Sequence, residues 1–167
     1  MLYIKDFVFN SISVNTYVIY NESKDCVIID AGNCNLREDN ALFDFIEKNQ
    51  LKPLMILNTH AHIDHILGNS STVKKYNIPM ASHPDGKEYF KTAYAYACAF
   101  GISYNDDDSV YPEIDLFDGQ IIKIGDDELK VIHTPGHAKG CCCFYCERQN
   151  FIMTGDTLFR RGIGRTD

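Results

Sequence analysis

One short segment, T-H-A-H-I-D-H from Thr59 to His65, constrains the fold of this chain more than any other feature of its sequence. It places three imidazoles and one carboxylate within six residues, directly after an apolar run typical of a short buried strand. In an extended segment, residues two apart project to the same side, so His60 and His62 can share one metal ion. The turn into the next helix can aim Asp64 and His65 at a second ion. We therefore expect the fold to hold a metal-binding loop at the end of a strand, and a polar loop in which the histidines coincide by chance is the alternative.

Two further segments place metal-ligand residues in similar loops after apolar strands. H-T-P-G-H contributes His137, and T-G-D-T contributes Asp156. A sheet fixes the position of such loops, and their short turns let side chains converge, as a metal with nitrogen and oxygen ligands requires. A carboxylate such as Asp156 can bridge two cations. A Gly-His or Gly-Asp turn by itself is more often structural. The presence of the Thr59 to His65 segment is what favours metal binding by His137 and Asp156.

The order of apolar runs predicts an α+β fold. Alternation predicts an antiparallel meander of three strands, over residues 2–9, 13–20 and 26–30. Shorter apolar runs predict further strands at 54–58, 78–82, 120–124, 128–133, 141–146 and 151–154. Helical spacing predicts helices between Asn35 and Pro53, over 66–76 and over 87–100, and Asn35 with Glu38 resembles a capping box. This order indicates two β-sheets packed together with helices on the outside.

Composition narrows the classes of partner. A chain of 167 residues with 45% hydrophobic residues suits one globular domain over 1–167. Sixteen basic and twenty-three acidic residues give a net charge of −7, the wrong sign for a protein that holds nucleic acid by its phosphates. No apolar stretch approaches the roughly 18 residues of a membrane span. Lys5 and Asp6 interrupt the start, where a secretory signal would be apolar, so we expect a cytoplasmic protein.

The seven cysteines are expected to stay reduced, since the chain shows no export signal. Four of them fall in C-C-C-F-Y-C at 141–146, where alternation and a strand position predict buried core thiols. The segment lacks the second cysteine pair that a zinc ribbon requires. A thiol beside the metal loops, with Cys141 as the candidate, would make the site sensitive to oxidation. The acidic run N-D-D-D-S at 105–109 is expected to be a solvated loop.

Over nearly its whole length this chain resembles the metallo-β-lactamase superfamily. The resemblance rests on the order and context of six residues, His60, His62, Asp64, His65, His137 and Asp156. The ending G-D-T-L-F-R-R-G-I-G-R-T-D is similar to the short, single-domain glyoxalase II-like branch, that is, to hydroxyacylglutathione hydrolase-like proteins. The resemblance implies an αβ/βα sandwich of two mixed β-sheets with helices on the outer faces.

By the same resemblance the site holds two divalent metal ions, with zinc expected and iron or manganese as alternatives. His60, His62 and His137 would bind one ion, and Asp64 and His65 would help to bind the other. Two cations about 3.5–4 Å apart can hold one water between them and lower its pKa toward 7, which yields a metal-bridging hydroxide as nucleophile. Asp64, close to that water, could orient it or receive its proton, and is the expected catalytic residue.

The resemblance also assigns roles around the metal ligands. Asp156 would bridge the two ions, and Asp30, in V-I-I-D-A-G, falls where the family carries an aspartate that steadies the metal loops. From the residues alone, Asp30 could equally be an acidic cap on the turn after a strand. Arg160, Arg161 and Arg165 form the only basic cluster near the expected site, and could hold the carboxylates of glutathione or another acidic thiol. A solvated basic loop is the alternative for these arginines.

Two features depart from the family pattern. Family members continue past G-R-T-D with a helix, a strand and a final Gly-His that completes the second metal site, whereas this chain stops at Asp167. We therefore expect a fragment that lacks the C-terminal helix, a strand and the last metal ligand, because an unpaired sheet edge would promote aggregation. Cys141 stands where the family commonly has a small hydroxyl residue.

The expected function is zinc-dependent hydrolysis of a small acyl thioester, such as a hydroxyacylglutathione. The superfamily also acts on lactams, phosphodiesters and persulfides, so the site alone predicts water activation and not the substrate. Two other classes stay open: a persulfide dioxygenase with a single iron held by two His and one Asp, and a non-catalytic metal-binding module. Nothing in the sequence predicts the oligomeric state.

Overall fold

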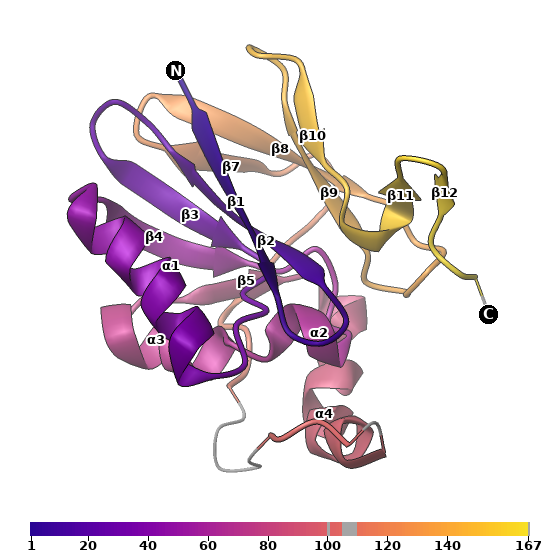
Figure 1. Ribbon diagram of the computed structural model, residues 1–167. Coiled ribbons are helices and arrows are strands. Elements are labelled where there is room, and N and C mark those ends of the chain that lie inside the picture. Colours follow the sequence, from indigo (N-terminus) through magenta and orange to yellow (C-terminus); the bar gives the residue numbers. More distant parts are fainter. Residues whose placement is uncertain (100, 105–109, 167) are drawn as a thin grey trace.

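The computed structural model describes residues 1–99, 101–104 and 110–166, in which two β-sheets pack face to face (Figure 1). The first sheet has six strands in chain order: β1 Tyr3–Phe9, β2 Val14–Tyr20, β3 Asp25–Ile29, β4 Lys52–Leu57, β5 Met80–Ser82 and β6 Ile114–Asp115. The second has the order β10-β9-β8-β7: β7 Ile121–Ile124, β8 Asp127–His133, β9 Cys142–Cys146 and β10 Phe151–Met153. A short hairpin follows, β11 Leu158–Phe159 and β12 Gly162–Ile163.

Helices connect the strands of the six-stranded sheet. They are α1 Leu36–Lys48, α2 Ile63–Ile66, α3 Asn69–Tyr76 and α4 Lys87–Ala99, with the 3-10 turn η1 Pro84–Gly86 before α4. A second 3-10 turn, η3 Gly155–Thr157, lies between β10 and β11. Because each crossover from β3 to β6 contains a helix, these strands run parallel, whereas β1, β2 and β3 form the expected antiparallel meander. The four-stranded sheet is antiparallel. None of these helices is long and apolar enough to cross a bilayer within the part of the chain that the structure describes.

The side chains of strand β3 pack alternately into two hydrophobic cores, one on each face of the six-stranded sheet. Cys26 and Ile28 point to the helices, and Val27 and Ile29 point to the other sheet, as a period of two requires. All four side chains are fully buried, which explains the uninterrupted apolar run. The strand is thus packed on both faces, which fixes the position of the next residue, Asp30, at the end of the strand. The expected α+β sandwich is confirmed.

The N-terminus of α1 differs from the expected capping box. The Asn35 side chain caps the helix by accepting hydrogen bonds from the backbone N–H groups of Arg37 and Glu38. The Glu38 carboxylate, however, accepts from the N–H groups of Cys34 at 2.9 Å and Asn10 at 3.1 Å. Glu38 therefore ties α1 to the β1–β2 turn, because that turn brings an unpaired N–H group within its reach.

Two local expectations need correction, and a third is not tested. The helix expected over 66–76 is two helices, α2 and α3, because the chain bends at Gly68, whose N–H donates to the Ala31 carbonyl at 2.7 Å and whose Cα packs against the Asn33 side chain. Strand β6 and the β11–β12 hairpin were not predicted, because strands of two residues have no measurable period. The acidic run at 105–109 lies outside the described residues.

Candidate metal centre

The predicted metal ligands converge at one edge of the sandwich, where loops from both sheets meet. They come from the loop after β4 with α2 (His60, His62, Asp64, His65), from the β8–β9 loop (His137) and from η3 after β10 (Asp156). Each loop follows a strand, as the sequence predicts. Side chains that are far apart in the chain are therefore brought together by the packing of the two sheets.

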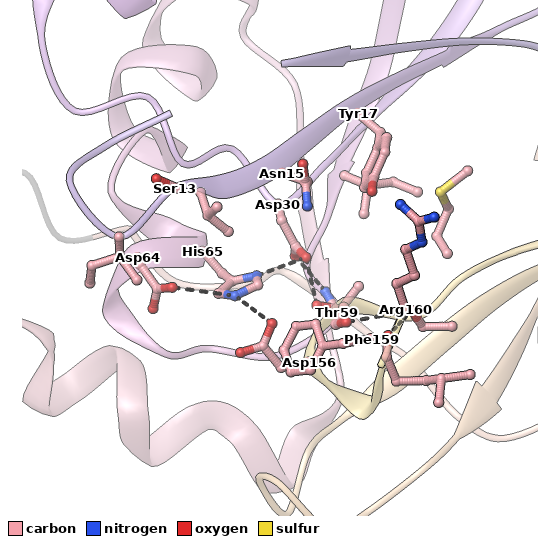
Figure 2. Close-up of a pocket in the computed structure, with 17 residues that line it drawn as sticks. Ser13, Asn15, Tyr17, Asp30, Thr59, Asp64, His65, Asp156, Phe159 and Arg160 are labelled. Carbon is pink, nitrogen blue, oxygen red and sulfur yellow. Dashed lines mark hydrogen bonds and ion pairs between the residues drawn. The ribbon is translucent and has the colours of Figure 1, made fainter. Parts of the chain in front are cut away.

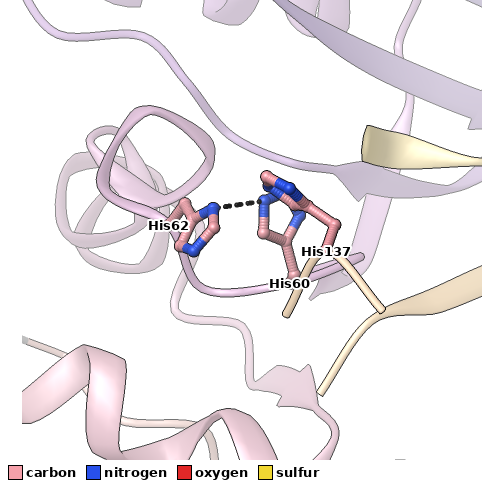
Figure 3. Close-up of side chains that lie close together, drawn as sticks. All are labelled: His60, His62 and His137. Atoms are coloured by element: carbon pink, nitrogen blue, oxygen red, sulfur yellow. Dashed lines mark hydrogen bonds between the residues drawn. The ribbon is translucent and has the colours of Figure 1, made fainter. Parts of the chain in front are cut away.

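Three histidine rings form the first ligand group, His60 with His62 and His137 (Figure 3). Their ring centroids lie 4.7 Å apart for His60 and His62, 5.0 Å for His60 and His137, and 4.5 Å for His62 and His137. His60 Nε2 lies 3.2 Å from His62 Nδ1. Two nitrogens on one tetrahedral zinc, each at about 2.0–2.1 Å, would lie about 3.3 Å apart. The spacing fits one shared ion.

Nδ1 of His137 and Nδ1 of His60 make hydrogen bonds outside the ligand group, which leaves Nε2 of each ring available to bind a metal. His137 Nδ1 lies 2.8 Å from the Arg165 carbonyl, so Nδ1 carries the proton and donates it, while Nε2 is buried with no hydrogen-bond partner in the described structure. The Thr59 hydroxyl donates to Asp30 at 2.6 Å and accepts from His60 Nδ1 at 3.2 Å. These bonds fix the tautomers that direct lone pairs into the group, as in metal sites.

His65, Asp64 and Asp156 lie together next to the first group (Figure 2). His65 Nε2 lies 3.5 Å from Asp64 Oδ2 and 3.4 Å from Asp156 Oδ1. The other oxygen of Asp156, Oδ2, lies 3.5 Å from His137 Nε2. Asp156 therefore presents one oxygen to each group, which is the arrangement expected of a bridging carboxylate.

Asp30 supports the centre from behind, at 1% exposure. Its carboxylate accepts hydrogen bonds from the Thr59 backbone N–H at 2.7 Å, from the Thr59 hydroxyl and from His65 Nδ1 at 2.9 Å. The bond to Nδ1 leaves His65 Nε2 facing Asp64 and Asp156. A carboxylate behind a metal-binding histidine orients the ring and raises its basicity.

Burial and charge divide the centre into two electrostatic parts. Burial, followed by the neighbouring imidazoles, holds the pKa of His60 well below its ordinary value, and burial and His137 lower the pKa of His62. Burial alone would lower the pKa of His65 too, but the carboxylates, led by Asp30, outweigh it and raise this pKa to about 10. Burial opposes ionisation of Asp156, yet His65 outweighs burial and lowers its pKa. Neutral His60 and His62 and an ionised Asp156 are the forms that bind metals, whereas His65 must release the proton on Nε2 to bind one.

A family model described as the metallo-beta-lactamase superfamily matches residues 11–167 of this chain. The chain belongs to this superfamily. Hydroxyacylglutathione hydrolase of Francisella tularensis subsp. novicida (strain U112) is 34% identical over 158 residues, which are 95% of this chain and 52% of that protein. The chain thus spans about half the length of this relative.

Two solved structures match almost the whole chain. BLEG-1 B3 metallo-beta-lactamase has a TM-score of 0.85 at 31% identity, over 99% of this chain and 77% of that one. TTHA1623 in a di-iron-bound form has a TM-score of 0.85 at 29% identity, over 98% of this chain and 77% of that one. Superfamily membership and the two ligand groups make this chain a metallo-hydrolase-type enzyme with candidate sites for divalent metals.

Two cavities meet at Asp64 of this centre, and Asp64 lines both of them. The larger, of about 380 Å³, lies between the β1–β2 turn and the β10–β11 segment and is also lined by Asp30, His65 and Asp156 (Figure 2). The smaller, of about 190 Å³, lies between His62 and α4. The candidate metal ligands are therefore flanked by two cavities.

The three arginines of the expected basic cluster do not act as one group in the structure. Arg160 lines the larger cavity, and Arg165 lines the smaller one. Arg161 is exposed and lines neither of these two cavities. Arg160 is thus the arginine placed to meet a ligand in the larger cavity.

Cys141 is a buried thiol beside the metal loops. It is 1% exposed, and its sulfur accepts a hydrogen bond from the Ala138 N–H at 3.3 Å. Burial raises the pKa of this thiol to about 11, so it has little thiolate character at neutral pH and is a poor target for oxidants. The other cysteines of the 141–146 segment are buried as well, as predicted.

Two residues of the centre had no predicted role. Thr59 links Asp30 to His60, and its place between the strand and the first histidine was a usable signal. The Tyr89 ring stands edge-on to His62, with centroids 5.2 Å apart and an interplanar angle of 82°. Nothing in the sequence marks Tyr89, because the face that α4 turns to the metal loops depends on tertiary packing.

Proposed function

We propose that this chain is a zinc-dependent hydrolase of small acyl thioesters, such as a hydroxyacylglutathione. The position of Asp156 carries this proposal: Oδ1 lies 3.4 Å from His65 and Oδ2 3.5 Å from His137, which suits two metal ions that share one carboxylate. When bound, two such ions polarise a carbonyl and lower the pKa of a water toward 7. No serine or cysteine nucleophile is then needed.

The surrounding side chains have distinct roles in this hydrolysis. The water oxygen bonds to the acyl carbon, the C–S bond breaks, and the thiol leaves as a thiolate. Asp64 lines both cavities, and we assign to its carboxylate the proton released by the water, which it can pass to the thiolate. Asp30 keeps His65 oriented, and Arg160 offers a positive charge to a carboxylate of the thiol in the larger cavity.

The thioester class is favoured by the hydroxyacylglutathione hydrolase relative, with the limit that this chain covers 52% of it. The match to a B3 metallo-beta-lactamase makes a β-lactam the natural comparison substrate. Hydrolysis of S-lactoylglutathione without hydrolysis of a β-lactam supports the proposal, and the reverse result contradicts it.

Replacement of Asp64 tests the mechanism. Asp64→Asn keeps the shape and one oxygen but cannot accept a proton, so kcat/KM for S-lactoylglutathione should fall about 10²–10⁴-fold. Asp44→Ala, an exposed aspartate on α1, serves as the control. Metal content measured on each variant separates a lost proton acceptor from a lost metal ligand. Unchanged activity with full metal content would show that Asp64 has no catalytic role.

A second candidate rests on one group of ligand atoms. His60, His65 and Asp156 present two imidazoles and one carboxylate within 4.8 Å of one another, the donor set of non-haem iron oxygenases. Elemental analysis decides between the candidates. About two zinc per chain favours the hydrolase, whereas about one iron, with oxygen uptake in the presence of glutathione persulfide, favours a persulfide dioxygenase.

A further inference from the structure

The smaller cavity, here called the α4 cavity, has largely apolar walls. Tyr89, Ala93 and Tyr96 line it from one face of α4, at helical positions i, i+4 and i+7. Ile12 of the β1–β2 turn and Ile63 of α2 line it from other sides. Its volume is about 190 Å³. Apolar cavities of about 150 Å³ can take up benzene, so this space suits one ring-sized group.

The α4 cavity opens directly onto the metal centre. His62 and Asp64 are part of its lining, and the Tyr89 ring stands edge-on to His62 at 5.2 Å. A group in this cavity would therefore lie directly beside His62 and Asp64. Helix α4 lies beside α2, which carries Asp64, so the wall and the centre are joined through short, packed elements (Figure 1).

The two cavities suit opposite ends of a thioester. The larger has about twice the volume, and its lining includes the polar residues Ser13, Asn15 and Arg160 beside apolar ones (Figure 2). A charged, extended thiol such as glutathione matches that space in size and polarity. The lining of the α4 cavity includes one cation, Arg165, but a volume of about 190 Å³ is too small for the three residues and two carboxylates of glutathione. The α4 cavity is left for the acyl group.

We propose that the α4 cavity receives the side chain of the substrate's acyl group, and that the physiological acyl group carries an apolar, ring-sized substituent. Tyr96 and Ala93 are the specificity-determining residues, because one forms an aromatic wall and the other limits the depth. The inference rests on the proposed thioester hydrolysis and specifies its substrate class as aryl-substituted hydroxyacyl thioesters.

Two hydroxyacyl thioesters that differ only in this substituent test the proposal. S-mandeloylglutathione carries a phenyl group where S-lactoylglutathione carries a methyl group. We expect the metal-loaded wild-type chain to prefer the mandeloyl ester in kcat/KM. Ala93→Leu fills the cavity and should lower this preference about tenfold or more. Tyr96→Ala, at a half-exposed position that leaves the core intact, should lower it about three- to tenfold.

Tyr94→Ala is the matched control, because Tyr94 is the same residue type on the same helix, is 45% exposed against 48% for Tyr96, and does not line the cavity. The preference of Tyr94→Ala for the mandeloyl ester over the lactoyl ester in kcat/KM should equal that of the wild type. A second measurement needs no turnover: calorimetric binding of the product acids, mandelate and lactate, to the metal-loaded protein. Ala93→Leu should weaken mandelate binding and leave lactate binding unchanged.

The outcomes separate this inference from the proposed function. If Ala93→Leu and Tyr96→Ala leave both the ester preference and mandelate binding unchanged, at full metal content, the α4 cavity does not bind the acyl group. If the wild-type chain hydrolyses neither ester but binds mandelate in an Ala93-dependent way, the cavity assignment stands and the thioester hydrolase proposal fails.

Discussion

At the scale of single residues, Asp30 shows how one side chain can organise a centre that it does not enter. It follows β3 directly and has φ of 52°, in the left-handed region that aspartate and asparagine tolerate better than most residues. This conformation turns the carboxylate back toward Thr59 and His65, which both donate to it. The charge also makes the largest contribution to raising the pKa of His65.

Asp30→Asn should therefore weaken metal binding without unfolding the chain. Asparagine keeps the shape and the backbone preference but removes the charge behind His65, and loss of such a partner typically lowers metal affinity 10–100-fold. Competition with a chromophoric chelator measures the affinity. Asp127→Asn, a second buried carboxylate remote from the centre, should bind metal like the wild type. Equal affinities in both variants would rule out a special role for Asp30.

A different pair of histidines lies outside the metal centre. The rings of His83 and His133 stack with centroids 3.8 Å apart and planes at 9°. Ring nitrogens in parallel planes cannot both point at one ion, so this pair is better explained by stacking than by metal binding, although Asp85 is close by. Burial, and then His133, lower the pKa of His83, whereas Asp85 and Asp115 oppose the shift.

This lowered pKa predicts a loss of stability in acid. His83 takes up a proton less readily in the folded chain than in the unfolded chain, where the pKa of histidine is about 6.5. The stability that neutral His83 contributes is therefore fully present above about pH 6.5 and is lost as the pH falls below that value. Urea unfolding of metal-free protein at pH 7.5 and 5.5 measures this. His83→Asn, which keeps an acceptor for the Asp85 N–H, should lose less stability on acidification. Identical losses in both proteins would contradict the prediction.

At the scale of secondary-structure elements, the β1–β2 turn connects α1 to the metal loops. The Asn10 side chain donates to the carbonyls of Gly32 at 2.9 Å and Asp64 at 3.0 Å, and the Asn10 N–H donates to Glu38. Asn10 thus links the β1–β2 turn by hydrogen bonds to the start of α1 and to the backbone of Asp64. The start of α1 therefore contributes to the position of the metal loop as well as to its own helix.

The cap of α1 can be tested separately from the centre. Asn35 has extended backbone geometry and accepts hydrogen bonds from Arg37 N and Glu38 N, both at 3.1 Å. Asn35→Ala should lower the free energy of unfolding by about 1 kcal/mol, and Asn35→Asp, which keeps the acceptor, by much less. Urea unfolding gives both values. Equal losses in the two variants would show that the cap bond does not stabilise α1.

At the scale of the whole molecule, the candidate ligands join the two sheets. His60 and His65 follow β4 of the six-stranded sheet, whereas His137 and Asp156 come from loops of the four-stranded sheet. Bound ions would therefore connect the two halves of the sandwich. Binding of any ligand to the folded chain alone stabilises that chain, by about 2.7 kcal/mol when the free ligand is at 100 times Kd.

Metal removal should accordingly lower the melting temperature. Calorimetry with zinc, and again after dialysis against a chelator, measures the shift, and restored zinc should reverse it. His137→Ala should reduce the shift because it removes the only histidine that the four-stranded sheet contributes to the first ligand group. A melting temperature that does not respond to the chelator would show that the ions do not join the sheets.

The sequence predicted strands and ligand types where local pattern is sufficient. The strands from β1 to β3 were visible because alternation with a period of two is a local property, and the ligand residues of Thr59 to His65 because they are adjacent in the chain. Strand β6 escaped because its two residues are held by pairing with β5, Ala81 with Ile114, and the break at Gly68 because it depends on contacts with Ala31 and Asn33.

The sequence by itself determined which residue types follow which strands, and so the superfamily and the candidate metal ligands, because these depend on the order of residues along one chain. Only the tertiary structure decided that Asp156 presents one oxygen to His65 and the other to His137. It also decided that Tyr89 and Tyr96 face a cavity beside His62. Such relations depend on how two sheets and a helix pack, and packing joins positions that no local pattern connects.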